Sequence, residues 1–274
     1  MSKLSFIGIG NMGSAMALGA LKNMSGENIY VSDADQAKAK AFCQEHGANY
    51  RDSNAELARL GDYIVISVKV FILPGVLEEI RPVLEEAADK GERKVLVPIA
   101  AGVFHKDLRR MLGDKICDHM PIVRCLPTIY ALLGCGLQSC SIESDFSRQA
   151  FDEISELMKG AGTFELMPES MIDLASTASG ATPAFTTMFI EAMADGMVLM
   201  GMPRDKAIDY CARGVYGGAA MVLEKNKHPE AIKDAVCSPG GSTIVGVNML
   251  EKNNFRYAAM EATHQAALKL LKKE

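Results

Sequence analysis

The first half of the chain alternates short apolar runs with segments of helical composition, and this alternation restricts the fold more than any other feature. The apolar runs are rich in valine and isoleucine and almost continuous in hydrophobicity, as strands are when helices cover both faces of a sheet. The five clearest runs are LSFIGI (4–9), NIYVS (28–32), YIVISV (63–68), KVLVPIA (94–100) and IVRCL (122–126). The segments between them have helical composition and often end at a glycine. The pattern predicts repeated βαβ units, and therefore an α/β fold with a doubly wound parallel sheet of the Rossmann type.

The sequence changes character after Met167, because no later run has the pattern of a strand. Long helical patterns follow instead, most clearly over 183–200, 204–225 and 255–272. The first of these is apolar around most of its circumference and carries only Glu191 and Asp195 as charged residues. A helix this apolar needs cover on several sides, which a second subunit often provides in a small domain. We therefore expect an all-helical, homodimer-forming domain in the C-terminal part of the chain.

Composition narrows the domain count and the classes of partner. A chain of 274 residues can form two domains, which we place at 1–165 (Rossmann) and 166–274 (helical dimerisation). The net charge of −5 gives no basic field for nucleic acid or an anionic membrane. Two uncharged runs, 4–21 and 125–142, contain too many glycines, hydroxyls or a proline to be membrane or signal segments. We expect a protein that acts on a small molecule.

The cysteines predict a reducing compartment. None forms a C-x-x-C pair, and an odd number without a framework is typical of free thiols in a cytoplasmic protein. We expect no metal site. The seven cysteines are residues 43, 117, 125, 135, 140, 211 and 237.

A glycine loop directly follows the first predicted strand. Gly8, Gly10 and Gly13 form the pattern G-x-G-x-x-G at the mouth of a predicted helix. The first glycine permits a tight turn, the second lets backbone N–H groups approach a pyrophosphate, and the third lets the helix pack close to its strand. In this strand–turn–helix context the loop predicts a bound dinucleotide.

The end of the second predicted strand bears on which dinucleotide is preferred. Asp33 lies there, twenty residues after Gly13. A carboxylate at this position accepts hydrogen bonds from an adenosine ribose, which favours NAD over NADP. Lys38 and Lys40 follow closely enough to help bind a 2′-phosphate, so NADP stays open.

Five stretches, taken in order, give the chain its resemblance to a known family. They are FIGIGNMGSAM, NAELARLGDYIVISVK, PIAAGV, FIEAMADGMVLMGMPRDKA and SPGGST. With them the chain resembles the pyrroline-5-carboxylate reductases from end to end, and the last motif is the most specific. The resemblance implies an NAD(P)H-dependent oxidoreductase of proline biosynthesis that delivers a hydride to the C=N bond of a cyclic imine. It also implies a Rossmann domain followed by an interwoven helical dimerisation domain, frequently assembled into rings of dimers.

The resemblance assigns cofactor contacts in the first domain. It places Asn11 and Met12 of the glycine loop against the pyrophosphate, and Asn54 beside the adenosine ribose or its phosphate. It places three further residues along the nicotinamide half of the cofactor: Lys69, Ala100 and Ala101. Lys69 follows a predicted strand at the carboxyl edge of the sheet, where ligands bind in this fold, although a lysine there is otherwise a surface charge.

The stretch CSPGGSTIVG (237–246) supplies the substrate contacts that the resemblance implies. Ser242 and Thr243 match the residues that hold the substrate's carboxylate and ring nitrogen, with Thr243 as the catalytic residue. Gly240 and Gly241 precede them and would let the substrate approach the free N–H groups of a helix N-terminus. On the residues alone, an equally good interpretation makes Ser242 a simple helix N-cap.

Three positions depart from the family pattern. GATP (180–183) stands where the family usually has glycine, serine, glycine and proline, and we expect Thr182 to cap the helix there. TIY (128–130) stands where the family commonly has asparagine, threonine and proline, which removes an amide close to the expected nicotinamide. Val70 stands where a proline commonly follows the lysine.

These departures leave alternatives open. One is a reductase of a different cyclic imine in the same fold, and another is an inactive paralogue that only binds the dinucleotide. A β-hydroxyacid dehydrogenase has a similar glycine loop but uses a catalytic lysine on the first long helix of its second domain. Residues 180–200 contain no lysine, which argues against that family.

Overall fold

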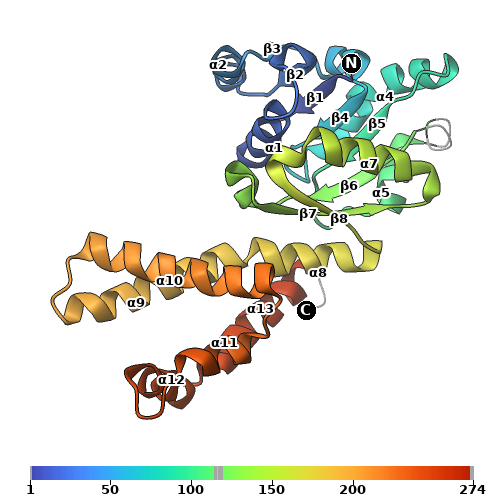
Figure 1. The fold of residues 1–274 in the computed structure, drawn as a ribbon. Coiled ribbons are helices and arrows are strands. Elements are labelled where there is room, and N and C mark those ends of the chain that lie inside the picture. The colour runs from blue at the N-terminus through green and yellow to red at the C-terminus, as the bar shows by residue number, and fades with distance from the viewer. Residues whose placement is uncertain (1, 114–115, 117–119, 272–274) are drawn as a thin grey trace. The chain divides into compact units, whose positions relative to one another are not determined.

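The computed structural model describes residues 2–113, 116 and 120–271, so the predicted thiol of Cys117 and the last predicted helical residue, 272, lie outside it (Figure 1). The chain divides into two compact units. The first comprises Met1–Gly180 together with Leu270–Glu274, and the second is Ala181–Lys269. The division follows Gly180, whereas the sequence predicted a boundary after residue 165. Helix α8 (Glu169–Gly180) therefore groups with the strands rather than with the long helices.

Five parallel strands form the sheet of the first unit, in the order β3-β2-β1-β4-β5. Four of them coincide with predicted apolar runs. The strands are β1 (Leu4–Ile7), β2 (Ile29–Ser32), β3 (Asn49–Tyr50), β4 (Tyr63–Ile66) and β5 (Val95–Pro98). The two residues of β3 carry no apolar run, which is why the sequence did not reveal this strand. The predicted Rossmann-type parallel sheet is confirmed.

A second sheet of three strands continues from the last predicted strand. It contains β6 (Val123–Leu126), β7 (Gly136–Ile142) and β8 (Gly162–Leu166) in that order. The predicted strand at 122–126 is present and buried, but its place in the parallel sheet was predicted wrongly: β6 forms its ladder antiparallel with β7, and the pairing toward β5 is a single isolated parallel bridge between Leu96 and Ile122. An apolar run identifies a buried strand but not the direction of its partner.

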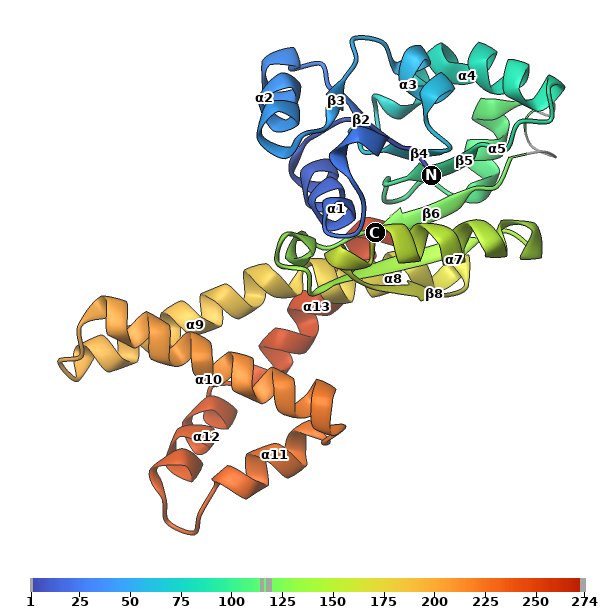
Figure 2. The ribbon, with the colours of Figure 1, turned by 45° about the horizontal axis from the view of Figure 1, so that its top comes forward.

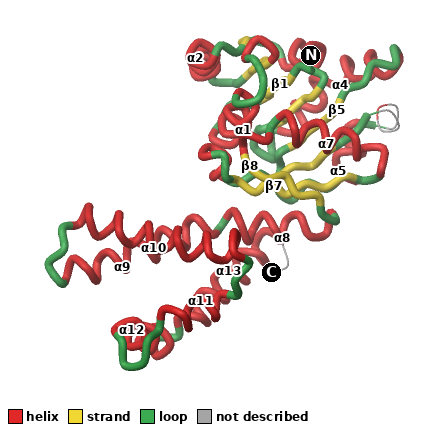
Figure 3. The backbone as a smooth tube through the Cα atoms, in the orientation of Figure 1, coloured by secondary structure: helices red, strands yellow, loops and turns green. Residues whose placement is uncertain are grey.

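Helices cover both faces of the parallel sheet (Figures 2 and 3). Val65 packs in the core cluster with α1, α2 and α7, whereas its neighbours Ile64 and Ile66 pack in the cluster with α3, α4 and α5. Because successive strand residues point to opposite faces, a continuous apolar run fills two cores at once. The helices are α1 (Asn11–Leu21), α2 (Gln36–His46), α3 (Asn54–Leu60), α4 (Leu73–Asp89), α5 (His105–Leu112) and α7 (Arg148–Leu157). The 3₁₀ turns are η1 (Gly26–Asn28), η2 (Ile129–Leu133), η3 (Asp145–Ser147) and η4 (Lys159–Ala161).

The described part of the second unit contains helices and turns alone. Its helices are α9 (Thr182–Leu199), α10 (Arg204–Lys225), α11 (Pro229–Val236), α12 (Ser242–Lys252) and α13 (Phe255–Leu271), the last two residues of which group with the first unit. The prediction that Thr182 caps α9 was wrong, because Ala181 precedes it in helical conformation and α8 ends only one residue earlier. None of the helices in the described residues is long and apolar enough to span a membrane.

The apolar residues of the second unit are largely uncovered within one chain. On α9 only Ala194 is buried, while Met188 and Leu199 are 69% and 87% exposed. On α10, Tyr216 and Leu223 are likewise exposed. Large apolar side chains that gather on one helical unit are usually covered by another protein surface.

Arg124 on β6 is the centre of a buried polar network in the first unit. Its Nη1 donates to Glu169 Oε1 at 3.0 Å, and its Nη2 lies 3.6 Å from Asp173 Oδ2. Both carboxylates belong to α8, and each also accepts a backbone hydrogen bond, from His105 to Glu169 (2.6 Å) and from Gly102 to Asp173 (3.1 Å). The network thereby ties α8 to the segment that leaves the carboxyl end of β5.

We predict that His105 makes stability depend on pH. Burial lowers the pKa of His105 below its ordinary value of 6.5. Between these two pKa values the unfolded chain binds a proton that the folded chain does not, so the free energy of unfolding should fall as the pH drops below 6.5. Denaturant unfolding of His105→Gln between pH 6.5 and 5.5 should show a shallower pH dependence. His264→Gln, an exposed control, should keep the wild-type slope, and equal slopes in all three proteins would contradict the prediction.

Candidate functional site

The glycine loop connects β1 to α1 and crosses the end of β4. Gly8 has a φ of +95°, and a Cβ there would lie 2.5 Å from the Ser67 carbonyl oxygen. A Cβ at Gly13 would lie 2.3 Å from the Gly8 oxygen. At Gly10 a Cβ would meet no protein atom within 4 Å. Gly8 and Gly13 are therefore required by close packing within the protein, whereas Gly10 faces open space that a ligand can occupy.

Helix α1 presents unoccupied backbone donors to that space. Its N-cap is Gly10, and no side chain caps its first turn. The free N–H groups and the positive end of the helix dipole suit a pyrophosphate. The residues present thus fit the dinucleotide that the sequence predicted.

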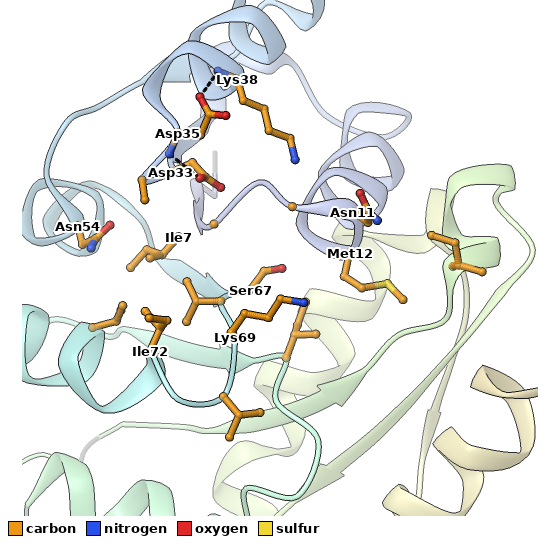
Figure 4. Close-up of a pocket in the computed structure, with 18 residues that line it drawn as sticks. Ile7, Asn11, Met12, Asp33, Asp35, Lys38, Asn54, Ser67, Lys69 and Ile72 are labelled. Carbon is orange, nitrogen blue, oxygen red and sulfur yellow. Dashed lines mark hydrogen bonds between the residues drawn. The ribbon is translucent and has the colours of Figure 1, made fainter. Parts of the chain in front are cut away.

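A pocket of about 820 Å³ opens beside the loop (Figure 4). It brings together most of the residues predicted for the cofactor. These are Gly8, Gly10, Asn11, Met12, Asp33, Asn54 and Lys69. Gly13 is buried in the first turn of α1 and does not line the pocket. Ala100 and Ala101 do not line the pocket either; their neighbour Ile99 does, and Ala100 is buried.

Asp33 does more than the sequence suggested. Its Oδ2 accepts a 2.7 Å hydrogen bond from Ile9 N, and its Oδ1 accepts one of 2.9 Å from Asp35 N. Asp33 therefore holds the glycine loop and the turn into α2 while it lines the pocket. Each carboxylate oxygen retains a lone pair, so a ribose hydroxyl can still donate to it.

The two lysines near Asp33 differ in position. Lys38 lines the pocket, and Figure 4 shows its side chain extending toward the glycine loop. Lys40 is absent from the pocket lining, and its Nζ lies 4.9 Å from the centre of the Tyr50 ring and 3.4 Å from Gln36 Oε1. The interpretation that both lysines could serve a 2′-phosphate is thus reduced to Lys38.

Several pocket residues were not predicted from the sequence. They share a position at or just beyond the carboxyl ends of the strands, or on the first turns of α2 and α4. They are Ile7, Ala34, Asp35, Ser67, Val68, Ile72, Val76 and Ile99. The rule that ligands bind at the carboxyl edge of a parallel sheet could have found Ser67, Val68 and Ile99. Ile72 and Val76 enter the site only because α4 packs beside β4.

Two of the departures from the family pattern face the same pocket. Val70 and Ile129 line it, and both are apolar. Thr128, the residue before Ile129, is 1% exposed, and its Oγ1 accepts a hydrogen bond from Leu137 N at 3.1 Å. The backbone of η2 is therefore anchored, and Ile129 presents a hydrocarbon surface to the pocket.

The SPGGST motif forms a turn followed by a helix in the second unit. Gly241 N donates to Ser238 O at 3.0 Å, and Gly240 has a φ of +69°, as a type II turn with Pro239 at its second position requires. The N-cap of α12 is Gly241, and no side chain caps it. The alternative that Ser242 is the N-cap was wrong: Ser242 and Thr243 are the first two helical residues, and both are exposed. Their hydroxyls are free of the capping role.

No cluster of three or more histidine, cysteine, aspartate or glutamate side chains within the described ranges could hold a metal ion.

Comparisons with known proteins match both units. A family model for the pyrroline-5-carboxylate reductase dimerisation region matches residues 169–272, and one for NADP oxidoreductases, coenzyme F420-dependent, matches residues 3–102. The pyrroline-5-carboxylate reductase of Escherichia coli (strain K12) is 38% identical over 263 residues, covering 95% of this chain and 94% of the relative. That of Pisum sativum is 33% identical over 266 residues, covering 96% and 93%. The crystal structure of Plasmodium falciparum pyrroline carboxylate reductase with NADP bound is 30% identical, covers 99% of this chain and 97% of the other, and has a TM-score of 0.82.

Two glycines of the loop, Gly10 and Gly13, should respond differently to substitution by alanine. Gly10→Ala should fold with a near wild-type melting temperature but bind dinucleotide weakly, because its methyl group occupies only the ligand's space. Gly13→Ala should lose about 1–3 kcal/mol of stability through overpacking against Gly8. Thermal melts and dinucleotide titrations would measure both. A Gly10→Ala protein that melts early yet binds normally would contradict the assignment.

Proposed function

Because this chain belongs to the family of pyrroline-5-carboxylate reductases, we propose that Ser242 and Thr243 bind the cyclic imine that it reduces. The chain is an NAD(P)H-dependent oxidoreductase that reduces 1-pyrroline-5-carboxylate to proline. The observation that carries the proposal is the uncapped, glycine-led start of α12, which leaves two hydroxyls and free N–H groups exposed together.

The cofactor is held, in this proposal, by the first unit. The free N–H groups at Asn11 and Met12 bind the pyrophosphate, Asp33 and Asn54 bind the adenosine ribose, and Lys69 reaches toward the nicotinamide half. Ala100 and Ala101 follow β5 and would flank the nicotinamide, next to Ile99 in the pocket wall. Bound NAD(P)H supplies the hydride.

The second unit positions the substrate. The substrate carboxylate binds the N-terminus of α12, where Ser242 donates a hydrogen bond and Gly240 and Gly241 leave room for approach. The Thr243 hydroxyl contacts the ring nitrogen, donating to the lone pair of the neutral imine or accepting from the N–H of the protonated one. When the carbon of the protonated imine accepts the hydride, the C=N π pair becomes the lone pair on nitrogen, and the product is the neutral amine of proline, which takes up a further proton from water. A protonated imine is already a good hydride acceptor, so orientation matters more than a strong acid.

The cofactor preference is also a proposal: the chain uses both dinucleotides and favours NADH. Two carboxylates, those of Asp33 and Asp35, line the adenosine end of the pocket, and one cation, Lys38, lines the pocket beside them. The NADP-bound relative supports retention of NADPH use.

The assembly we propose is a homodimer through the second unit, with dimers assembled further into a ring. The exposed apolar residues of α9 and α10 support it, because a second copy can cover them. Light scattering of the purified chain should give at least twice the mass of one chain, and a monomer would contradict the proposal. The free thiols of the six described cysteines support a cytoplasmic location.

Ile129 favours a second candidate function, in which the preferred substrate is a related cyclic imine. Its hydrocarbon surface replaces a polar position in the pocket. A panel of five- and six-membered cyclic imino acids, assayed for kcat/KM, separates the two candidates. A preference for the five-membered pyrroline-5-carboxylate excludes the second.

Steady-state assays with pyrroline-5-carboxylate should show oxidation of both NADH and NADPH. Thr243→Ala should lower kcat by about tenfold to a hundredfold, because the hydrogen bond at nitrogen forms in the transition state. Thr243→Ser, which keeps the hydroxyl, should recover most of the rate, and Ser242→Ala should mainly raise KM for the imine. Turnover with neither cofactor, or an unchanged kcat in Thr243→Ala, would contradict the proposed site.

A further inference from the structure

A chain of three polar side chains lies at one end of the cofactor pocket. Ser32 Oγ donates a hydrogen bond to Asn54 Oδ1 at 2.7 Å, and Asn54 Nδ2 donates one to Glu79 Oε2 at 2.7 Å. Ser32 is the last residue of β2, Asn54 is the first of α3, and Glu79 lies on α4. Three elements far apart in sequence thus meet at a single amide. That amide, of Asn54, lines the pocket (Figure 4).

This end of the pocket is where an adenosine ribose binds in a Rossmann fold. The carboxyl end of β2 marks it, and Asp33 follows Ser32 there. Asn54 is therefore placed to contact the ribose or a phosphate on its 2′ oxygen.

Glu79 determines which way the Asn54 amide points. An ionised carboxylate can only accept hydrogen bonds, so the amide group facing Glu79 has to be the NH₂. The Ser32 hydroxyl, which is 3% exposed, then donates to the amide oxygen. Asn54 is held from both sides, and it keeps one N–H and one lone pair for a ligand.

Glu79 also adds negative charge at this end of the pocket. Its carboxylate contacts the neutral amide of Asn54, and no cation among the described residues pairs with it. Asp33 and Asp35 add two further carboxylates, and Lys38 is the cation beside them. A 2′-phosphate placed here meets an excess of negative charge, whereas a ribose hydroxyl does not.

We propose that Glu79 is a specificity-determining and positioning residue: it orients Asn54 toward the ribose and disfavours the 2′-phosphate of NADPH. This inference rests on the proposed function only in that the pocket binds a nicotinamide dinucleotide. It predicts a change in the ratio of the two cofactors, whichever of them the wild type prefers.

Two substitutions separate the two roles of Glu79. Glu79→Gln removes the charge, yet its amide oxygen can still accept from Asn54, so kcat/KM for NADPH relative to NADH should rise about threefold to tenfold at low salt. The rise should shrink in 0.5 M salt, because the Debye length is then roughly 4 Å and screening weakens the field of the Glu79 carboxylate. Glu79→Ala also frees Asn54 and should weaken binding of both cofactors.

Glu78→Gln is the matched control. It removes the same charge from the neighbouring exposed position of α4; neither glutamate lines the pocket, and the Asn54 amide donates its hydrogen bond to Glu79. It should leave the NADPH to NADH ratio at the wild-type value. Melting temperatures of all variants identify any loss of folding.

Dissociation constants for NAD⁺ and NADP⁺, measured by titration, keep this test independent of turnover. If the wild type bound dinucleotides but reduced no imine, the proposed function would fail while the role of Glu79 could still be scored. An unchanged ratio in Glu79→Gln, or an equal change in Glu78→Gln, would overturn the proposal. A ratio that rises in Glu79→Gln alone and falls back in high salt would support it.

Discussion

The first unit depends on covering five parallel strands on both faces. Residues 63–66 fill one helix-covered core with Val65 and the other with Ile64 and Ile66, so neither face of the sheet is available to a ligand. What is left is the carboxyl edge, where every strand ends in a loop. The glycine loop, Asp33, Asn54 and the residues after β4 gather there for that reason, although they are spread over more than sixty positions of the chain.

Two helix starts, those of α1 and α12, combine a glycine N-cap with free backbone N–H groups. Several other helices have a capping side chain or a proline in their first turn; Asp35 caps α2 and Ser53 caps α3. Helices α7 and α10 have neither, but their N-caps are not glycines. The N-caps of α1 and α12 are glycines, and neither helix has a side-chain cap. An uncapped helix start is unfavourable in a protein by itself, and an anionic ligand removes that cost. In the proposed function the first binds a pyrophosphate and the second a carboxylate.

Polar groups in the first unit act mainly by holding backbone and side chains in one arrangement. Asp33 accepts hydrogen bonds from the glycine loop, and Glu169 and Asp173 accept them from the segment after β5 while Arg124 neutralises both. Glu79 does the same for the Asn54 amide. For the buried or half-buried carboxylates of Asp33, Glu169 and Asp173, a charge without partners is costly, so these contacts favour a single geometry. The site is therefore positioned by groups that need not touch the ligand.

The sequence by itself determined the alternation of strands and helices, the glycine loop and the family, because hydrophobic period and glycine spacing are local properties. Most of the residues that it predicted for the cofactor line the pocket, but many other lining residues, such as Ser67 and Ile72, were not predicted. The tertiary structure alone decided what depends on partners distant in the chain. Residues 122–126 gave no sign of the antiparallel partner of β6, and the run before α12 left open whether Ser242 or Gly241 is the N-cap. Only folding brought Ser32, Asn54 and Glu79 together, since one strand and two helices had to pack before one amide could be held from two sides.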